Sequence, residues 1–83
     1  MNKVLVRVYV PKLEKNFEMW LPLNKRLCNI VNLLVKTIDD FCKGYYKPEG
    51  IPILYNKSTA EEYNLNLLLK DTNIRNGTEL ILI

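Results

Sequence analysis

Histidine is absent from this chain of 83 residues, and cysteine occurs only twice. Histidine is the commonest general acid or base in enzymes, and zinc sites take most of their ligands from histidine and cysteine. The adjacent carboxylates Asp39-Asp40 and Glu61-Glu62 do not replace them, because neighbouring side chains on a helix or strand point in different directions. The sequence therefore predicts a protein without catalytic activity, bound metal or cofactor.

Long hydrophobic runs are also absent. The longest span a handful of residues, whereas a transmembrane helix needs roughly 18 to 20. The first stretch, MNKVLVRVYVPKLEK, alternates apolar with polar side chains and lacks the continuous apolar core of a signal peptide. We expect a cytoplasmic protein without membrane insertion, folded as a single domain over residues 1–83.

Neither the cysteines nor the charges indicate special chemistry. Cys28 and Cys42 fall on one expected helix about 20 Å apart, whereas a disulfide needs Cα atoms within about 7 Å. We expect reduced thiols, buried as small hydrophobic side chains. The net charge of +3 comes from 12 basic and 9 acidic residues dispersed along the chain, whereas nucleic-acid-binding proteins usually cluster their cations.

The first quarter of the chain has the period-two pattern of a β-hairpin. Residues 3–10 alternate valine with other side chains, residues 17–21 alternate again, and Pro11 begins a turn between them. These segments predict two antiparallel strands, each with one buried face.

An amphipathic helix is expected next. Apolar residues recur every three or four positions, at Leu27, Ile30, Val31, Leu34, Ile38, Phe41 and Cys42. We expect the helix to run from Lys25 to Lys43, with Asn24 capping its start and Gly44 providing a left-handed residue at its end.

The second half of the chain predicts two further strands. Residues 53–55 form a short apolar run expected near a sheet edge, and Asn76-Gly77 marks a turn before a last strand over residues 79–83. The pattern of residues 59–69 is compatible with a short strand or a helical turn. We expect a core that contains Val4, Val6, Phe17, Leu21, Ile30, Leu34, Ile74, Leu80 and Leu82.

The order of hairpin, single helix and further strands resembles the β-grasp or ubiquitin-like fold. In that fold a leucine and an isoleucine fill the core before the final strand, and the segment LKDTNIRNGTELIL is similar at Leu69, Asp71, Asn73, Ile74, Gly77, Leu80 and Leu82. The resemblance implies an α+β protein with one helix packed across one face of a mixed four- to five-stranded sheet. It also implies that the apolar last strand lies mid-sheet, paired on both sides.

Within this superfamily the sequence resembles the YukD/EsaB group, small bacterial ubiquitin-like proteins associated with type VII (ESX-like) secretion. The shared features are Asn56-Lys57 after the third strand, the turn from Ile74 to Gly77, and an end on the last strand at Ile83; the longer helix departs from the group. The resemblance implies a non-enzymatic adaptor that is accessory to a bacterial type VII secretion system and binds a protein partner, such as a component of that system.

Two other functions stay open. Conjugated modifiers and sulfur carriers of this superfamily end in a flexible Gly-Gly tail, whereas this chain ends in ELILI, so conjugation is expected only if the sequence is truncated. Arg7, Tyr9, Trp20 and Tyr55 combine aromatic rings with a cation and could stack single-stranded nucleic acid, although no glycine-aromatic RNA-binding signature is present.

Strand parity places one set of side chains on the sheet face away from the helix. The first and last strands are neighbours in the ubiquitin-like fold, so their side chains are expected to form one contiguous apolar patch. A soluble monomer rarely leaves such a patch uncovered. We therefore predict a protein-binding or self-association surface made of Leu5, Arg7, Tyr9, Trp20, Ile81 and Ile83. The alternative is that the loop over residues 45–52, or a second copy of the chain, covers it.

Overall fold

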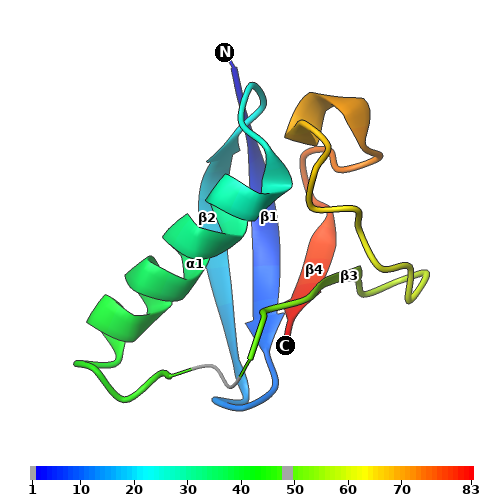
Figure 1. Ribbon diagram of the computed structural model, residues 1–83. Coiled ribbons are helices and arrows are strands. Elements are labelled where there is room, and N and C mark those ends of the chain that lie inside the picture. Colours follow the sequence, from blue (N-terminus) through cyan, green and yellow to red (C-terminus); the bar gives the residue numbers. More distant parts are fainter. Residues whose placement is uncertain (1, 48–49) are drawn as a thin grey trace.

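The computed structural model describes residues 2–47 and 50–83, and Figure 1 shows their arrangement. The elements are β1 (Lys3–Val10), β2 (Lys15–Pro22), helix α1 (Leu27–Phe41), β3 (Leu54–Asn56), the short 3₁₀ helix η1 (Leu69–Asp71) and β4 (Glu79–Leu82). The hairpin, the helix and the two later strands all form where the sequence predicts them, with ends that differ by no more than two residues.

The four strands form one mixed sheet in the order β2-β1-β4-β3. β1 pairs with β2, and β3 with β4, in the antiparallel sense, whereas β1 and β4 are parallel. The last strand therefore lies mid-sheet, as predicted. α1 crosses one face of the sheet (Figure 1), and the other face carries no helix in the described part of the chain. This arrangement confirms the predicted α+β β-grasp architecture.

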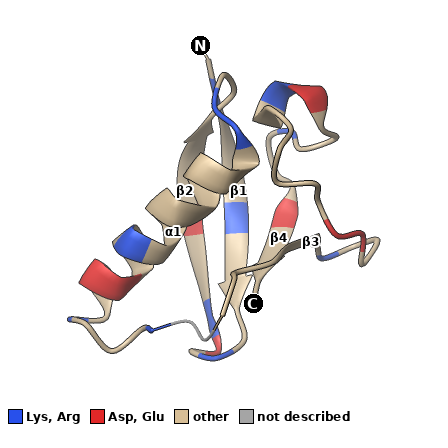
Figure 2. Cartoon of the chain, viewed as in Figure 1, with Lys and Arg blue, Asp and Glu red and all other residues tan. Residues whose placement is uncertain are grey.

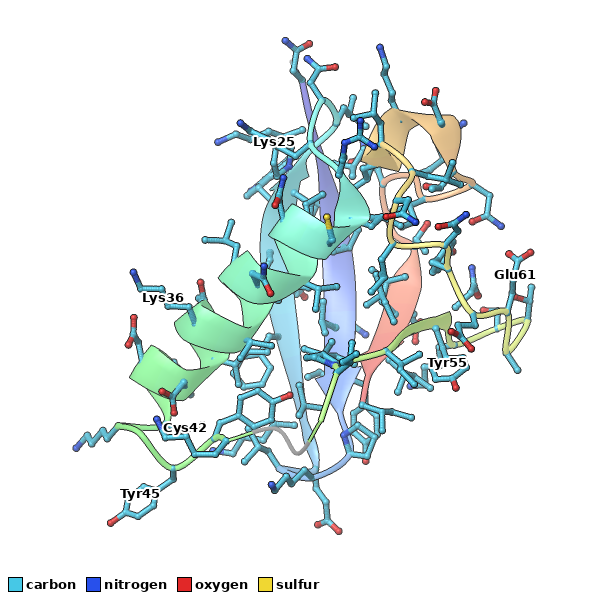
Figure 3. All side chains as sticks on the ribbon, in the orientation of Figure 1. Lys25, Lys36, Cys42, Tyr45, Tyr55 and Glu61 are labelled. Carbon is cyan, nitrogen blue, oxygen red and sulfur yellow. The ribbon has the colours of Figure 1, made fainter. Side chains whose placement is uncertain are left out.

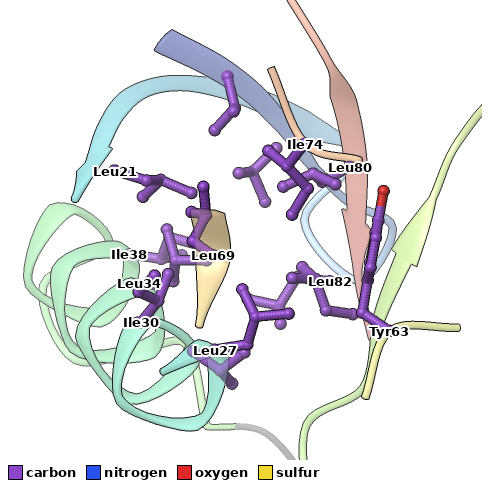
Figure 4. Close-up of a cluster of buried hydrophobic side chains, with 14 of the residues drawn as sticks. Leu21, Leu27, Ile30, Leu34, Ile38, Tyr63, Leu69, Ile74, Leu80 and Leu82 are labelled. Atoms are coloured by element: carbon purple, nitrogen blue, oxygen red, sulfur yellow. The ribbon is translucent and has the colours of Figure 1, made fainter. Parts of the chain in front are cut away.

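The core lies between α1 and the sheet. It takes alternate residues from each strand and one stripe from the helix, and Figure 4 shows Leu34 of α1 and Leu80 and Leu82 of β4 among its side chains. Ile74, from the segment before β4, is fully buried as well. All the predicted core residues are buried except Phe17, which packs half-buried at the margin.

The start of α1 corrects the prediction of a side-chain cap. The helix begins two residues later than expected, its N-cap is Arg26 rather than Asn24, and no side chain caps it. Its first N–H groups donate instead to distant backbone carbonyls: the Leu27 N–H to that of Leu67 at 2.9 Å and the Cys28 N–H to that of Leu65 at 2.8 Å. A long-range backbone contact satisfies the groups that a cap would serve, and a local sequence pattern does not reveal such a contact.

The end of α1 matches the prediction at Gly44 and departs from it at Phe41. Gly44 has a φ of +85°, and its N–H donates to the Asp39 carbonyl at 2.9 Å, so a left-handed residue closes the helix. Phe41 belongs to the predicted apolar stripe but is 65% exposed. The last turn projects beyond the sheet (Figure 1), where the ring of Phe41 meets that of Phe17 edge-on at 5.4 Å.

A hydrogen-bond chain that starts at the buried residues Asn56 and Tyr63 anchors the segment between β3 and β4, which is irregular apart from η1. The side-chain amide of Asn56 donates to the Tyr63 hydroxyl at 2.9 Å, and this hydroxyl donates to the side-chain oxygen of Asn73 at 2.7 Å. Burial raises the pKa of Tyr63, so its hydroxyl keeps the proton that it donates. The segment predicted as a short strand or helical turn is therefore fixed to β3 by these side-chain bonds and by backbone hydrogen bonds, from the Asn56 N–H to the Glu61 carbonyl at 2.9 Å and from the Tyr63 N–H to the Leu54 carbonyl at 3.0 Å.

Candidate functional site

The sheet face opposite α1, called the open face below, carries all the site residues predicted from the sequence. It is formed by odd-numbered residues of β1, β3 and β4 and even-numbered residues of β2, because the alternate residues of these strands face the core. The register fixes how the predicted side chains meet across the strands. They fall into separate rows, which run across the sheet from β2 to β3.

One row brings together Tyr9 of β1, Ile81 of β4 and Tyr55 of β3, which are direct cross-strand partners. The next row continues with Ile83 and Ile53, which exchange backbone hydrogen bonds of 2.9 and 3.0 Å. These five residues are called the tyrosine cluster. Ile83 is 61% exposed and the others are half-buried, so the cluster presents apolar surface to its surroundings.

At the other end of the open face, Leu5 pairs with Trp20 across β1 and β2. Trp20 is 52% exposed and Leu5 is half-buried. The two residues are called the tryptophan pair. Cross-strand pairs of this kind stabilise a sheet and also expose a large aromatic ring beside an aliphatic side chain.

A row of alternating charges separates the tryptophan pair from the tyrosine cluster. Arg7 Nη2 lies 3.2 Å from Glu18 Oε1, and Lys57 Nζ lies 3.4 Å from Glu79 Oε2. Arg7 and Glu79 are cross-strand partners, and Figure 2 shows the basic segment of β1 beside the acidic segment of β4. The four charges therefore balance within the row, called the charged row below.

The prediction of one contiguous patch needs correction. Leu5 does not lie with Ile81, because the charged row passes between them. Strand parity assigns a residue to a face, but only the register shows which residues share a row, and it aligns Arg7 with charged partners on both sides. The open face therefore carries two separate apolar areas, and Lys57 of the charged row borders the tyrosine cluster, with its Nζ 5.4 Å from the centre of the Tyr9 ring.

The loop between α1 and β3 was the expected alternative cover for this face. Its residue Tyr46 is buried in the core, whereas Tyr45 is 85% exposed and Ile51 is 83% exposed. Side chains this exposed do not pack over the open face. Pro48 and Glu49 lie outside the described residues.

Among the described residues, no three side chains of the types His, Cys, Asp and Glu are grouped so that they could hold a metal ion. No helix in residues 2–47 and 50–83 combines the length and the apolar character needed to cross a membrane. Cys28 and Cys42 are free thiols, each half-buried rather than fully buried as predicted.

The predicted surface contained no residue from β3 or its flanks, where the structure places Ile53, Tyr55 and Lys57 on the open face. The run Ile53-Leu54-Tyr55 is apolar throughout, so it shows no alternation from which the outward side could be read. Asn56 adds to the difficulty, because a buried polar residue follows the run. Lys57 beside Tyr9 became visible only once the pairing of β3 with β4 was known.

No protein-family model and no curated protein matches the sequence, but solved structures do. A chain of a MycP5-free ESX-5 inner membrane complex superposes with a TM-score of 0.82 at 15% identity, covering 100% of this chain and 21% of that one. The ubiquitin-like domain of the Mycobacterium tuberculosis type VII secretion system protein EccD1 gives 0.79 at 13% identity, covering 100% and 99%. A chain of the toluene 4-monooxygenase HD complex gives 0.74 at 11%, covering 96% and 95%.

These likenesses concern the fold. The present chain spans about a fifth of the length of the ESX-5 chain that it matches and nearly all of the EccD1 domain. The third match shows that the same fold also occurs in a different kind of complex. Together with the strand order and the helix, they show that this chain has the ubiquitin-like fold.

Proposed function

We propose that residues 1–83 form a single ubiquitin-like domain that acts as a non-enzymatic adaptor in the cytoplasm of a bacterium, accessory to a type VII secretion system. Its open face binds a protein component of that system. The observation that carries the proposal is the pair of apolar areas on the open face, which α1 does not cover.

The chemistry of the open face supports a protein partner. The tyrosine cluster and the tryptophan pair provide aromatic and aliphatic side chains, and aromatic residues are enriched where protein interfaces gain most of their binding energy. The charged row needs no partner to be neutral, since Arg7 and Lys57 each have an acidic neighbour. A binding protein that covers both apolar areas also covers the charged row between them, whose charges are already paired within this chain.

The same charges count against the alternative of single-stranded nucleic acid. Nucleic-acid binding depends on cationic side chains that neutralise phosphates and so release the counterions condensed on the nucleic acid. Arg7 and Lys57, the cations of the charged row, face Glu18 and Glu79, so the row offers a phosphate no net positive charge.

The link to secretion rests on the likeness of the chain to the EccD1 domain and to the ESX-5 chain, and on the resemblance to the YukD/EsaB group. Because the likeness shows the fold alone, a partner has to be tested directly.

The test is co-purification of the tagged chain from its source cells, compared with the double variant Leu5→Glu with Ile81→Glu, which places a carboxylate in each apolar area. We expect a type VII secretion protein to co-purify with the wild type and to be lost with the double variant. Ile83→Glu, at a more exposed position, gives the same test with less risk to folding. Leu67→Glu is the matched control, since Leu67 is 41% exposed in the segment between β3 and β4.

Thermal unfolding of each variant shows whether it is folded. Retention of the same partner by folded Leu5→Glu/Ile81→Glu protein would reject the open face as the binding surface. Light scattering of the purified chain tests for self-association. A dimer that forms with the wild type and not with the double variant would mean that the open face binds a second copy.

A further inference from the structure

The basic residues are dispersed along the sequence, but the fold brings several of them together at one end of the molecule. The start of β1, the loop between β2 and α1, and η1 lie at this end (Figure 1), and Figure 2 shows basic residues on the loop and on η1 there. The turn before β4 adjoins them, since the Gly77 N–H donates to the Leu5 carbonyl at 2.8 Å. This surface is called the basic end, and its cations are Lys3, Lys25, Arg26, Lys70 and Arg75.

Backbone hydrogen bonds fix the segments of the basic end to one another. The Leu23 N–H donates to the Asn2 carbonyl at 2.8 Å, and the Lys70 N–H donates to the Leu23 carbonyl at 3.0 Å. The Leu69 N–H donates to the Lys25 carbonyl at 2.9 Å. Each lysine of the basic end is at one of these bonds or next to it, so the fold holds the three lysines as neighbours.

Neutral groups hold the two arginines of the basic end. Arg26 Nη1 donates to the Asn66 carbonyl at 2.9 Å. Arg75 Nη1 donates to the carbonyls of Thr72 and Ile74, each at 2.7 Å. Backbone carbonyls orient a guanidinium group but carry no net charge. Both arginines therefore stay positively charged and are fixed in place.

Little acidic charge opposes these cations. Asp71 of η1 is the one acidic residue in the segments of the basic end, and all five cations are exposed. Among the described residues, the ion pairs involve other cations, namely Arg7, Lys47 and Lys57. The rest of the chain has seven basic and eight acidic residues. The positive net charge of the protein therefore comes from the basic end.

The other side chains of the basic end do not suit nucleic acid. Pro22, Leu23 and Leu68 are half-buried among the cations, and the segments of the basic end contain no Phe, Tyr or Trp. Domains that bind single-stranded nucleic acid combine cations with aromatic rings on which the bases stack. The basic end provides only the cations.

The arrangement of the cations favours a flat binding partner. They come from separate segments and are exposed at one end of the molecule, where Figure 3 shows the side chain of Lys25 extending away from the ribbon. A peptide needs a groove or a strand edge that aligns it along the protein. An anionic membrane is a surface that contacts several outward charges at once, and the attraction of each Lys or Arg adds to that of the others.

We propose that the basic end binds the anionic surface of a lipid membrane. Its lysines and arginines face the lipid phosphates, and the domain lies on the headgroups. The tyrosine cluster stays free for a protein, because Tyr9 is six residues from Lys3 on β1, about 20 Å at the rise of a strand. This site is additional to the open face and does not rest on the proposed link to secretion.

Co-sedimentation of the purified chain with sucrose-loaded vesicles tests the proposal. One set of vesicles contains equal parts of phosphatidylcholine and phosphatidylglycerol, and the other contains phosphatidylcholine alone. We expect the partition coefficient to be at least about tenfold higher with phosphatidylglycerol, since five cations face the anionic lipid. Added salt should reduce this difference, because it screens the attraction.

A matched pair of charge reversals tests the location of the site. Lys25→Glu with Lys70→Glu changes the basic end and should weaken binding to the anionic vesicles at least about tenfold. Lys12→Glu with Lys36→Glu makes the same change in net charge at exposed positions beyond the far end of β1 and in the second half of α1. This control should weaken binding less than about threefold, since salt screens charges more than about 10 Å from the membrane.

Thermal unfolding shows whether each variant is folded. If the charge reversal at the basic end does not fold, Lys25→Gln with Lys70→Gln replaces it. This variant removes the two charges without adding acids, and it should weaken binding at least about fivefold.

Equal binding to the two kinds of vesicle would overturn the proposal, and so would an equal loss of binding in the two folded double variants. Tighter binding of polyglutamate or of oligo-dT than of the anionic vesicles would also overturn it, since the basic end would then serve an acidic protein or a nucleic acid. The open face is tested separately, by co-purification with substitutions at Leu5, Ile81 and Ile83. Either proposal can therefore fail without the other.

Discussion

The two faces of the sheet are built from the same strands but follow different rules. On the helix side, Val6, Leu21 and Leu80 are almost completely buried, and α1 closes over them. On the open face, Trp20 and Ile83 stay more than half exposed, and paired charges lie between the apolar side chains. One face is filled by its own chain, whereas the other shows apolar surface that its own helix does not cover. The contrast separates the residues that hold the fold from those available for binding.

The largest loss of stability is expected from a substitution that leaves a cavity on the buried face. Leu34→Ala should lower the free energy of unfolding by about 2 to 5 kcal/mol, because a fully buried leucine leaves a cavity. Leu33→Ala is the matched control on the same helix, and its half-exposed side chain should change stability by no more than about 0.5 kcal/mol. Chemical denaturation of both variants measures the difference. Equal losses would mean that the helix does not present Leu34 to the sheet.

A smaller loss is expected from the hydrogen-bond chain that anchors the segment before β4. Tyr63→Phe removes the hydroxyl between Asn56 and Asn73 and should cost about 1 to 3 kcal/mol, because the buried side-chain amide of Asn56 loses its acceptor. Denaturation with urea measures the change. Tyr55→Phe is the control, since Tyr55 lies half-buried on the open face, and a loss at Tyr55 as large as that at Tyr63 would contradict the assigned role of the buried chain.

The stability of the protein should also depend on pH in the alkaline range, because two buried tyrosines lose their protons there. Burial raises the pKa of Tyr46 and of Tyr63 above the ordinary value of 10.0, so the folded state holds these protons more tightly than the unfolded state does. Their contribution to stability is complete below pH 10 and is lost as the pH rises through the raised values. The double variant Tyr46→Phe with Tyr63→Phe should lose less stability between pH 9 and pH 11 than the wild type. An unchanged pH dependence would argue against the burial of both hydroxyls.

The smallest effect on stability is expected on the open face. Arg7→Ala removes an ion pair whose side chains are both more than half exposed, and such pairs contribute about 0 to 1 kcal/mol. The melting temperature should change little, and added salt should reduce the difference from the wild type further. A loss comparable to that of Leu34→Ala would mean that the charged row is part of the fold and not only of its surface.

The sequence predicts the buried face better than the open one. Alternating valines have the period of a strand, and the apolar stripe of residues 27–42 has the period of a helix. The hairpin, α1, the last strand and nearly all of the expected core are therefore found where these patterns place them. Asn24 does not cap the helix, because backbone carbonyls distant in the sequence bind its first N–H groups. Phe41 is exposed, because the last turn of the helix lies beyond the sheet. Both effects depend on tertiary structure and cannot be read from neighbouring residues in the sequence.

The open face could be predicted only in part. Parity placed Leu5, Tyr9 and Ile81 on it, but the row in which each lies depends on the pairing of β1 with β4, which are far apart in the chain. The short run of residues 53–55 has no alternation, so Tyr55 was not assigned to the predicted surface. The position of β2 at one end of the sheet likewise follows from the strand order, which resemblance to a fold can suggest but composition cannot.

The central claim is that a protein partner binds the open face, and photo-crosslinking in source cells tests it most directly. A photoreactive phenylalanine analogue replaces Tyr55 in one variant and Tyr45 in another, so that both substitutions exchange one aromatic ring for another. Tyr45 is 85% exposed, whereas Tyr55 is half-buried on the open face. The account predicts a crosslink to a type VII secretion protein from position 55 and none to that protein from position 45. Stronger crosslinking of the same partner from position 45, or no protein crosslink from position 55, would contradict it.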